Sequence, residues 1–468
     1  MSKGIGIVYL LILALIIVAI IYIIPEVEWH APQVNIKIDS QYIGLKPFDV
    51  EIKDKGKGLK EVSILLVNER GQIELINKIY QLPTNEDKIT IALDPKAHGL
   101  KDGPAEIKVV AEDGSRLKLF SGNKTEVNRK VILDLEAPKV EVLTADQYIN
   151  HGGSGLAIYK ASEDSVKSGV KVGDYFFPGY KGYFTDPNAF LAFFAFPFNM
   201  PSDERLTVVS EDAAGNSKEV VFSHNLKGVV YKKSDITIDD DFIKGKMASL
   251  LGSDSSEEND SKKIFIQVNR ELRKKNDNTI KEIGSKSSDS IKWKGAFHQL
   301  SNSQVEANFA DERTYYINGE PIDQQYHLGY DLAVTKRYPI EAANDGAVVF
   351  TGDLGIYGNS IIIDHGMGVM TLYGHVSSID VKEGDSIKKS QIIGRTGETG
   401  LAVGDHLHYG VYINGVPVRP IEWWDEKWIN DNIILKIKTA EAEFGSKQIK
   451  TEASPEKSSQ ETDKKVEN

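Results

Sequence analysis

The chain contains no cysteine, so a disulfide framework and a thiolate metal site are both excluded. Any metal ion must therefore be held by histidine and carboxylate side chains. An excess of positive charge is also lacking, because 56 Lys and Arg residues stand against 68 Asp and Glu residues, for a net charge of -12. We therefore expect no nucleic-acid partner of the kind that depends on a basic surface.

Long apolar runs are absent except at the N-terminus. Residues 5–24 carry no charge, and a helix of about 20 residues spans a hydrocarbon core of roughly 30 Å. The run ends at Pro25 without a small-residue cleavage pattern, which favours an uncleaved anchor over a signal peptide. Lys3 before the run and Glu28 after it predict a cytoplasmic N-terminus. We expect residues 1–25 to be a cytoplasmic stub and transmembrane anchor in the lipid bilayer of the inner membrane, with the remainder extracytoplasmic.

An internal repeat follows the apolar run. An Ala-Pro-x-Val motif begins at Ala31 and again at Ala137, and in each copy Gln-Tyr-Ile follows ten residues later. Alternating apolar residues between Gly, Asp and Asn turns are typical of β-sandwiches. The turn at 212–216, Asp-Ala-Ala-Gly-Asn, resembles the end of bacterial immunoglobulin-like domains. We expect two such sandwiches, at 31–136 and 137–231, with cell-wall or division proteins as candidate partners.

Helical patterns replace the strand patterns in the segment 239–290. Three aspartates at 239–241 suit a helix N-terminus, and apolar residues that share one face follow them. The stretch 252–263 is almost entirely polar, so we expect a helical link with a polar insert. The last residues, 438–468, are rich in Lys, Glu, Ser and Thr and predict a disordered tail.

Four of the ten histidines lie in three short motifs, 326–331, 373–375 and 405–409, between this helical segment and the tail. His327 and Asp331 are four residues apart, which in a straight strand is too far for both to reach one ion. Gly329 between them would let the chain curl around the ion. The pair alone is a weak signal, because the same spacing arises by chance.

Two further histidines, His406 and His408, lie two apart in a run of strand formers and therefore face the same side of a sheet. One of them can bind a metal ion while the other faces a substrate. His375 follows an apolar run between these motifs. His365 ends an apolar strand at a turn, and a structural role is favoured for it.

In this order the motifs resemble the LytM or lysostaphin-type zinc metallopeptidases of the M23 peptidase family. The resemblance runs from about Trp293 to Trp424 and places the peptidase domain at 292–428. The segments that carry it are Phe309, Arg313, 327–333, 364–366, 372–375, 384–385, 393–394 and 406–408.

The resemblance implies one zinc ion held by His327, Asp331 and His408, with water in the fourth position. Two imidazoles and a carboxylate leave the open tetrahedral position that catalytic zinc requires. Zinc lowers the pKa of its water to about 7 and polarises the scissile carbonyl. His375 and His406 would orient the water, pass its proton to the leaving amine and stabilise the oxyanion. Which of the two does which stays open.

The family also implies a small, mostly antiparallel β-fold and cleavage of peptide bonds in peptidoglycan stem peptides or cross-links. We therefore expect a mainly β chain: one transmembrane helix, two immunoglobulin-like sandwiches, a short helical link and the peptidase domain. The predicted function is that of a membrane-anchored zinc endopeptidase. The alternatives are a non-catalytic cell-wall binder or activator of other hydrolases, and a lipoyl-type carrier suggested by the turn at 381–387. The carrier alternative predicts no bound metal.

Overall fold

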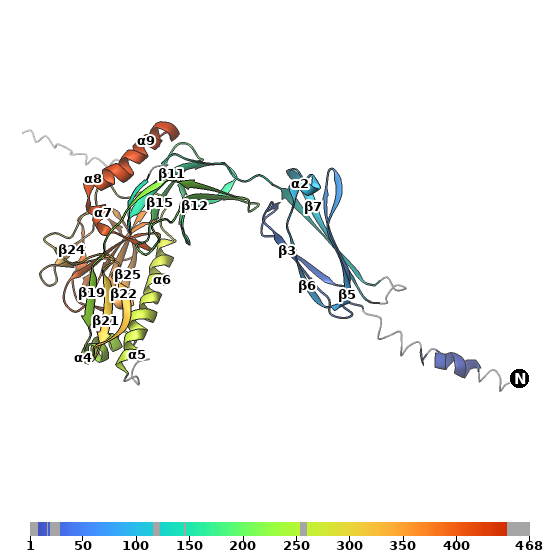
Figure 1. Ribbon diagram of the computed structural model, residues 1–468, viewed down its shortest axis with the longest axis horizontal. Coiled ribbons are helices and arrows are strands. Elements are labelled where there is room, and N and C mark those ends of the chain that lie inside the picture. The colour runs from blue at the N-terminus through green and yellow to red at the C-terminus, as the bar shows by residue number, and fades with distance from the viewer. Residues whose placement is uncertain are drawn as a thin grey trace, which may run out of the picture. The chain divides into compact units, whose positions relative to one another are not determined.

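The computed structural model is mainly β (Figure 1). It describes residues 8–15, 17–18, 29–115, 122–144, 147–252 and 260–446. The predicted anchor at 5–24 lies partly outside these residues. No helix in the described part of the chain is long and apolar enough to cross a membrane.

The chain divides into two compact units, which are described separately. Unit 1 comprises residues up to 147, 159–179 and 200–225. Unit 2 comprises 148–158, 180–199 and the residues from 226 onward. The predicted second sandwich, 137–231, is therefore divided between the two units.

The first repeat forms two sheets around one core in unit 1. The smaller sheet contains β1 (Gln33–Lys37), β3 (Phe48–Lys53) and β6 (Glu86–Ile91). The larger sheet has the order β2 (Tyr42–Ile43), β8 (Lys124–Leu133), β7 (Gly103–Asp113), β4 (Leu59–Asn68) and β5 (Gly71–Thr84). A short helix, α2 (Pro95–His98), follows β6. Every second residue of β7 from Ala105 on is buried, as the alternating sequence predicts.

The rest of unit 1 contains an antiparallel sheet in the order β13 (Tyr175–Pro178), β12 (Ser165–Val172), β16 (Leu206–Asp212) and β17 (Ser217–Phe222). The short strand β9 (Val140–Val142) pairs with the last residues of β11 (Ser154–Ala161).

One buried Asp–Asn pair occurs in both repeats. The Asp113 Oδ1 atom accepts a hydrogen bond from the Asn123 backbone N–H, and its Oδ2 atom accepts one from the Asn123 side chain, both at 2.8 Å. Asp212 and Asn216 make the same two bonds at 2.9 Å. Because both carboxylates are buried, these bonds satisfy charges that would otherwise be costly to remove from water. The repeated pair supports the duplication inferred from the sequence.

The central sheet of unit 2 is antiparallel. Its order is β20 (Gln304–Ala307), β23 (Tyr330–Ala333), β31 (Leu407–Ile413), β27 (Val369–Gly374), β26 (Asn359–Gly366), β25 (Gly346–Asp353) and β29 (Ser386–Ile387), and β32 (Val416–Val418) pairs with β31. A small sheet contains β24 (Pro339–Glu341), β30 (Ile392–Arg395) and β28 (Ser378–Ile379). A second one contains β19 (Lys233–Thr237), β21 (Glu312–Ile317) and β22 (Glu320–Tyr326).

Strands from the predicted second sandwich also contribute to unit 2. They are β14 (Tyr180–Lys181), β15 (Ala189–Ala195), most of β10 (Gln147–Asn150) and the last two residues of β18 (His224–Lys227). The buried Glu422 carboxylate holds this part of the chain by accepting hydrogen bonds from Asn150 Nδ2 at 2.7 Å and Ser154 N at 3.0 Å. Phe193 packs against the rings of Trp293 and Trp423.

The helical segment is built into the core of unit 2. It comprises α4 (Asp240–Phe242), η2 (Ile243–Met247), α5 (Ser261–Ile266), η4 (Gln267–Leu272) and α6 (Arg273–Gly284). Its buried residues, including Met247, Phe265 and Val268, share one hydrophobic cluster with Tyr357 and Tyr412. Figure 1 shows α6 running alongside the strands of this unit. The segment predicted as a link therefore packs against the domain that follows it.

The C-terminal helices differ from the prediction. They are α7 (Pro420–Trp424), α8 (Glu426–Ile429), η6 (Asn430–Ile434) and α9 (Leu435–Phe444). The predicted tail begins at residue 438, but α9 continues to Phe444, whose ring packs edge-on against Phe184 at a centroid distance of 5.7 Å. Apolar residues at helical spacing thus extend the helix into a segment that composition alone assigns to the tail. Residues 447–468 of the predicted tail lie outside the described residues.

The contact between α6 and the turn before β32 provides a stability test. A Cβ atom at Gly284 would lie 2.4 Å from the Gly415 backbone nitrogen, so there is no room for a side chain. We expect Gly284→Ala to lower the free energy of unfolding by about 1–3 kcal/mol. Thermal or denaturant unfolding of the full chain measures this loss.

Gly245→Ala is the matched control, because nothing lies within 4 Å of a Cβ atom at that helical position. This variant should be neutral or more stable by about 0.5–1 kcal/mol. Equal stability of the two variants would contradict close packing of the helical segment on the sheet.

Candidate metal centre and active-site cavity

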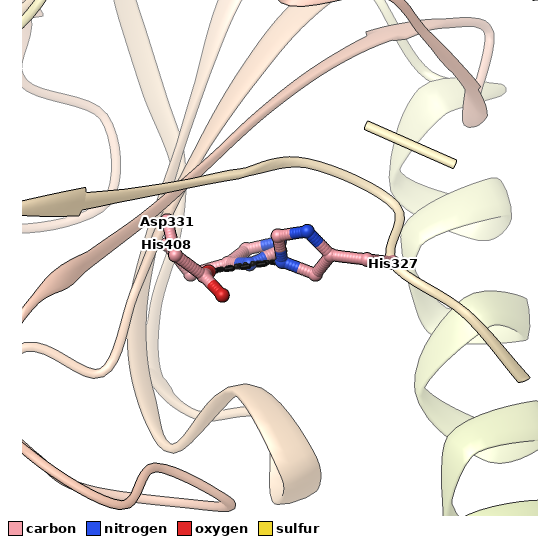
Figure 2. A group of neighbouring side chains, drawn as sticks. All are labelled: His327, Asp331 and His408. Carbon is pink, nitrogen blue, oxygen red and sulfur yellow. Dashed lines mark hydrogen bonds and ion pairs between the residues drawn. The ribbon is translucent and has the colours of Figure 1, made fainter. Parts of the chain in front are cut away.

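Two neighbouring strands and the turn before them bring three side chains together. In the pairing of β23 with β31, Asp331 lies directly opposite His408, so the two side chains leave the same face of the sheet. His327 follows the end of β22 and approaches from the other side, as Figure 2 shows. The backbone N–H of Ala310 donates to the His327 carbonyl at 2.6 Å and fixes the turn.

The three side chains converge on one point. The His327 Nε2 atom lies 2.9 Å from Asp331 Oδ1 and 3.1 Å from His408 Nδ1, and the latter two atoms are 3.1 Å apart (Figure 2). Bonds of about 2.1 Å in tetrahedral geometry require ligand atoms roughly 3.4 Å apart. Two imidazole nitrogens and one carboxylate oxygen at this spacing therefore fit a single transition-metal ion after a small expansion.

Hydrogen bonds prepare two of these side chains for binding a cation. The His327 Nδ1 atom lies 2.9 Å from the Asn308 carbonyl oxygen and must donate to it, so Nε2 keeps its lone pair. Burial alone would raise the pKa of Asp331, but the charge and hydrogen bond of His327, with hydrogen bonds from the other two histidines, hold it well below its usual value. The second carboxylate oxygen of Asp331 lies 3.4 Å from Arg313 Nη2.

Gly329 lies in the turn between His327 and Asp331, as their spacing predicts. The structure shows in addition that a side chain at this position would collide with His408. A Cβ atom at residue 329 would lie 2.7 Å from His408 Nε2 and 2.6 Å from the Tyr409 carbonyl oxygen. The backbone can pass this close to the His408 ring only if residue 329 has no side chain.

The other two predicted histidines flank the three converging side chains. The rings of His375 and His406 lie 4.8 Å apart, and the His375 ring is 5.9 Å from that of His408. Each Nδ1 atom donates to a backbone carbonyl at 2.8 Å, His375 to Thr399 and His406 to Gly404. The Nε2 atom of His375 is thereby left to accept a proton, whereas Nε2 of His406 lies 3.5 Å from Asp331 Oδ1.

Their electrostatic environments differ. Burial, together with the neighbouring imidazoles, lowers the pKa of His375 to about 3, so this ring is neutral. Burial also lowers the pKa of His406, but the hydrogen bond and charge of Asp331 outweigh it and raise the pKa above its usual value. His375 also has a left-handed backbone, with a φ angle of 62°. Such a conformation is costly for a non-glycine residue and is concentrated at functional sites.

A cavity of about 480 Å³ opens onto all five residues. Unit 2 strands and loops form part of its wall, including Arg313 and the exposed Glu306. The helical segment forms another part, through Phe242, Met247, Phe265, Asn269 and Arg273. The cavity is thus broader than the histidine motifs predict, because residues distant in the sequence complete it.

His365 does not line this cavity. It is fully buried, with Nδ1 2.7 Å from the Asp345 carbonyl oxygen and Nε2 2.8 Å from Thr371 Oγ1. Both ring nitrogens are therefore used in holding the sheet together, in agreement with the structural role predicted for it. The sequence motifs predict no site role for Arg313 or Arg273. Only Arg313 could have been found from the sequence, because it is one of the residues that carry the resemblance to the M23 family.

An antiparallel sheet that presents two imidazoles and a carboxylate at one point, with further histidines beside them, is typical of metal-dependent hydrolases. Residues 325–420 match the model of peptidase family M23. The chain therefore carries a domain of this metallopeptidase family, as the motifs predict.

Comparison with known proteins gives relatives for this domain. The DD-carboxypeptidase/endopeptidase Mpg of Neisseria meningitidis is 43% identical over 95 residues, which are 20% of this chain and 22% of that protein. The peptidoglycan DD-endopeptidase ShyA of Vibrio cholerae is 34% identical over 119 residues, 25% of this chain and 27% of that protein. The chain thus spans about a quarter of the length of these relatives.

Among solved structures, the catalytic domain of lysostaphin from Staphylococcus simulans matches 28% of this chain and 98% of its own, with 28% identity and a TM-score of 0.24.

Gly329→Ala tests the close approach of the backbone to His408. We expect the affinity for a divalent transition metal to fall by about 10–100-fold, since the added methyl group displaces a ligand. Competition with a chromogenic chelator measures this affinity. Gly404→Ala is the control, because it lines the same cavity with nothing within 4 Å of its Cβ atom. Unchanged affinity in Gly329→Ala would show that His408 is not positioned this way.

Proposed function

We propose that this chain is a membrane-anchored zinc endopeptidase that cleaves peptide bonds in peptidoglycan stem peptides or cross-links. The observation that carries the proposal is the convergence of His327, Asp331 and His408 within one cavity that also holds His375 and His406. The similarity to ShyA, a peptidoglycan DD-endopeptidase, supports peptidoglycan as the substrate.

The residues present would hold one zinc ion through His327 Nε2, Asp331 Oδ1 and His408 Nδ1. Bound there, zinc would supply a water molecule of lowered pKa and polarise the scissile carbonyl. Arg313 holds the second oxygen of Asp331, which keeps that carboxylate oriented with one oxygen toward the centre.

The neighbouring histidines would manage protons and charge around the reacting carbonyl. The neutral His375, whose Nδ1 proton is committed to Thr399, can accept a proton at Nε2. His406, whose pKa is raised, is suited to donate a hydrogen bond from Nε2 to developing negative charge on the carbonyl oxygen. The proposed assignment is therefore His375 as the proton acceptor and His406 as the stabilising donor.

The surroundings of this domain complete the proposal. The apolar run at 5–24 would anchor the chain in the inner membrane with its N-terminus in the cytoplasm. The sheets of the first repeat, and the buried Asp–Asn pair that both repeats share, support two immunoglobulin-like domains after the anchor. The acidic net charge supports a partner other than nucleic acid.

Substitution of the site histidines tests the chemistry. His408→Ala should lose both the bound metal and the cleavage of purified sacculi. His375→Gln should keep the metal but lower kcat by about 10²–10⁴-fold, because it removes a proton acceptor. Analysis of the released muropeptides and the metal content of the full-length protein measures both effects. The exposed His30, replaced by Gln, is the control. Full cleavage by His408→Ala would overturn the proposal.

Cell fractionation tests the anchor. The full chain should sediment with membranes and be released by detergent but not by high salt, because its attachment is apolar. A chain that lacks residues 5–24 should be recovered in the soluble fraction. Release of the full chain by salt alone would contradict the anchor.

A further inference from the structure

The helical segment contributes a cationic side chain to the cavity of the metal centre. Asn269 and Arg273, in η4 and at the start of α6, line the same cavity as His327 and Asp331. Both residues precede the 325–420 region that matches the peptidase family. This part of the cavity wall is therefore a feature of this chain that the family match does not account for.

Arg273 is held in place by a chain of side-chain contacts. Asn269 is fully buried, and its Nδ2 atom donates to Asp323 Oδ2 at 2.8 Å. Its Oδ1 atom then accepts from Arg273 Nη2 at 3.0 Å, and its carbonyl accepts from Arg273 Nε at 3.3 Å. The charge of Asp323 is balanced by Arg270, at 2.8 Å. The guanidinium of Arg273 is thus oriented by neutral groups.

Most other charged groups of the cavity already have partners. Arg313 is paired with Asp331. Asp405 accepts hydrogen bonds from the Arg337 backbone N–H and from Thr396 Oγ1. Arg273, in contrast, has no carboxylate of the described residues within 4.0 Å, although the charge of Asp277 acts on it from farther away. Its guanidinium has five N–H donors, and only two of them are used.

A guanidinium that is fixed, charged and incompletely bonded beside a hydrolytic centre favours a carboxylate ligand, because the two groups match in charge and in geometry. We propose that Arg273 binds a carboxylate of the substrate peptide. This inference rests on the proposed function, since it concerns the substrate of the same site. It assigns the helical segment a part in selecting anionic peptides, beyond its structural packing on the sheet.

The test uses two forms of one cross-linked muropeptide dimer, with carboxyl groups either free or converted to amides. The full-length wild-type protein should cleave the free form with a kcat/KM at least about tenfold higher, mainly through a lower KM, because a charge-assisted contact is removed by amidation. Arg273→Met should lose this preference, so that its kcat/KM values for the two dimers are equal. Arg273→Lys should keep part of the preference.

Lys274→Met is the matched control, because Lys274 is an exposed cation next in sequence that does not line the cavity. It should discriminate like the wild type. Equal kcat/KM of the wild type on both dimers overturns the inference whatever the stability of the variants, while leaving the proposed function intact. Failure of the wild type to cleave either dimer overturns the proposed function, and this inference with it.

Discussion

The candidate site depends on one buried carboxylate. Asp331 lies in the sheet opposite His408, and removing its charge from water is costly unless other groups compensate for it. Three histidines and Arg313 surround it within 3.5 Å, so that this single side chain orders the polar groups around it. A divalent cation would compensate the charge more completely, which is why a cluster of this composition is better explained by metal binding than by stability alone.

The core of unit 2 explains how the cavity acquires its second wall. Met247, Phe265 and Val268 of the helical segment are buried with Tyr357 of the peptidase domain in one cluster. Burying a side chain of this size contributes about 1.5–3 kcal/mol, so the helices are held against the sheet. The same packing fixes Arg273 at the cavity. Stability and the proposed substrate selection therefore arise from one contact surface.

Much of the candidate site could be predicted, because its residues lie in short motifs. His406 and His408 lie two apart among strand-forming residues, which predicts that both side chains face the same side of the sheet. Gly329 between His327 and Asp331 indicates a tight turn. The left-handed backbone of His375 left no signal, since only the hydrogen bond of its N–H to Tyr357 and the surrounding chain impose it. The sequence also predicts helices at 239–284. It does not predict which surface of the peptidase domain these helices cover.

The sequence by itself determined the family of the domain at 325–420, the histidine and aspartate side chains of the candidate site and the mainly β character, since these depend on residue identity and local periodicity. The tertiary structure alone decided that residues 148–158 and 180–199 belong with the peptidase, and that the chain stays helical to Phe444. It also decided that Arg273 faces the cavity of the metal centre. Such features depend on contacts between residues far apart in the chain, such as Glu422 with Asn150, and local patterns do not encode them.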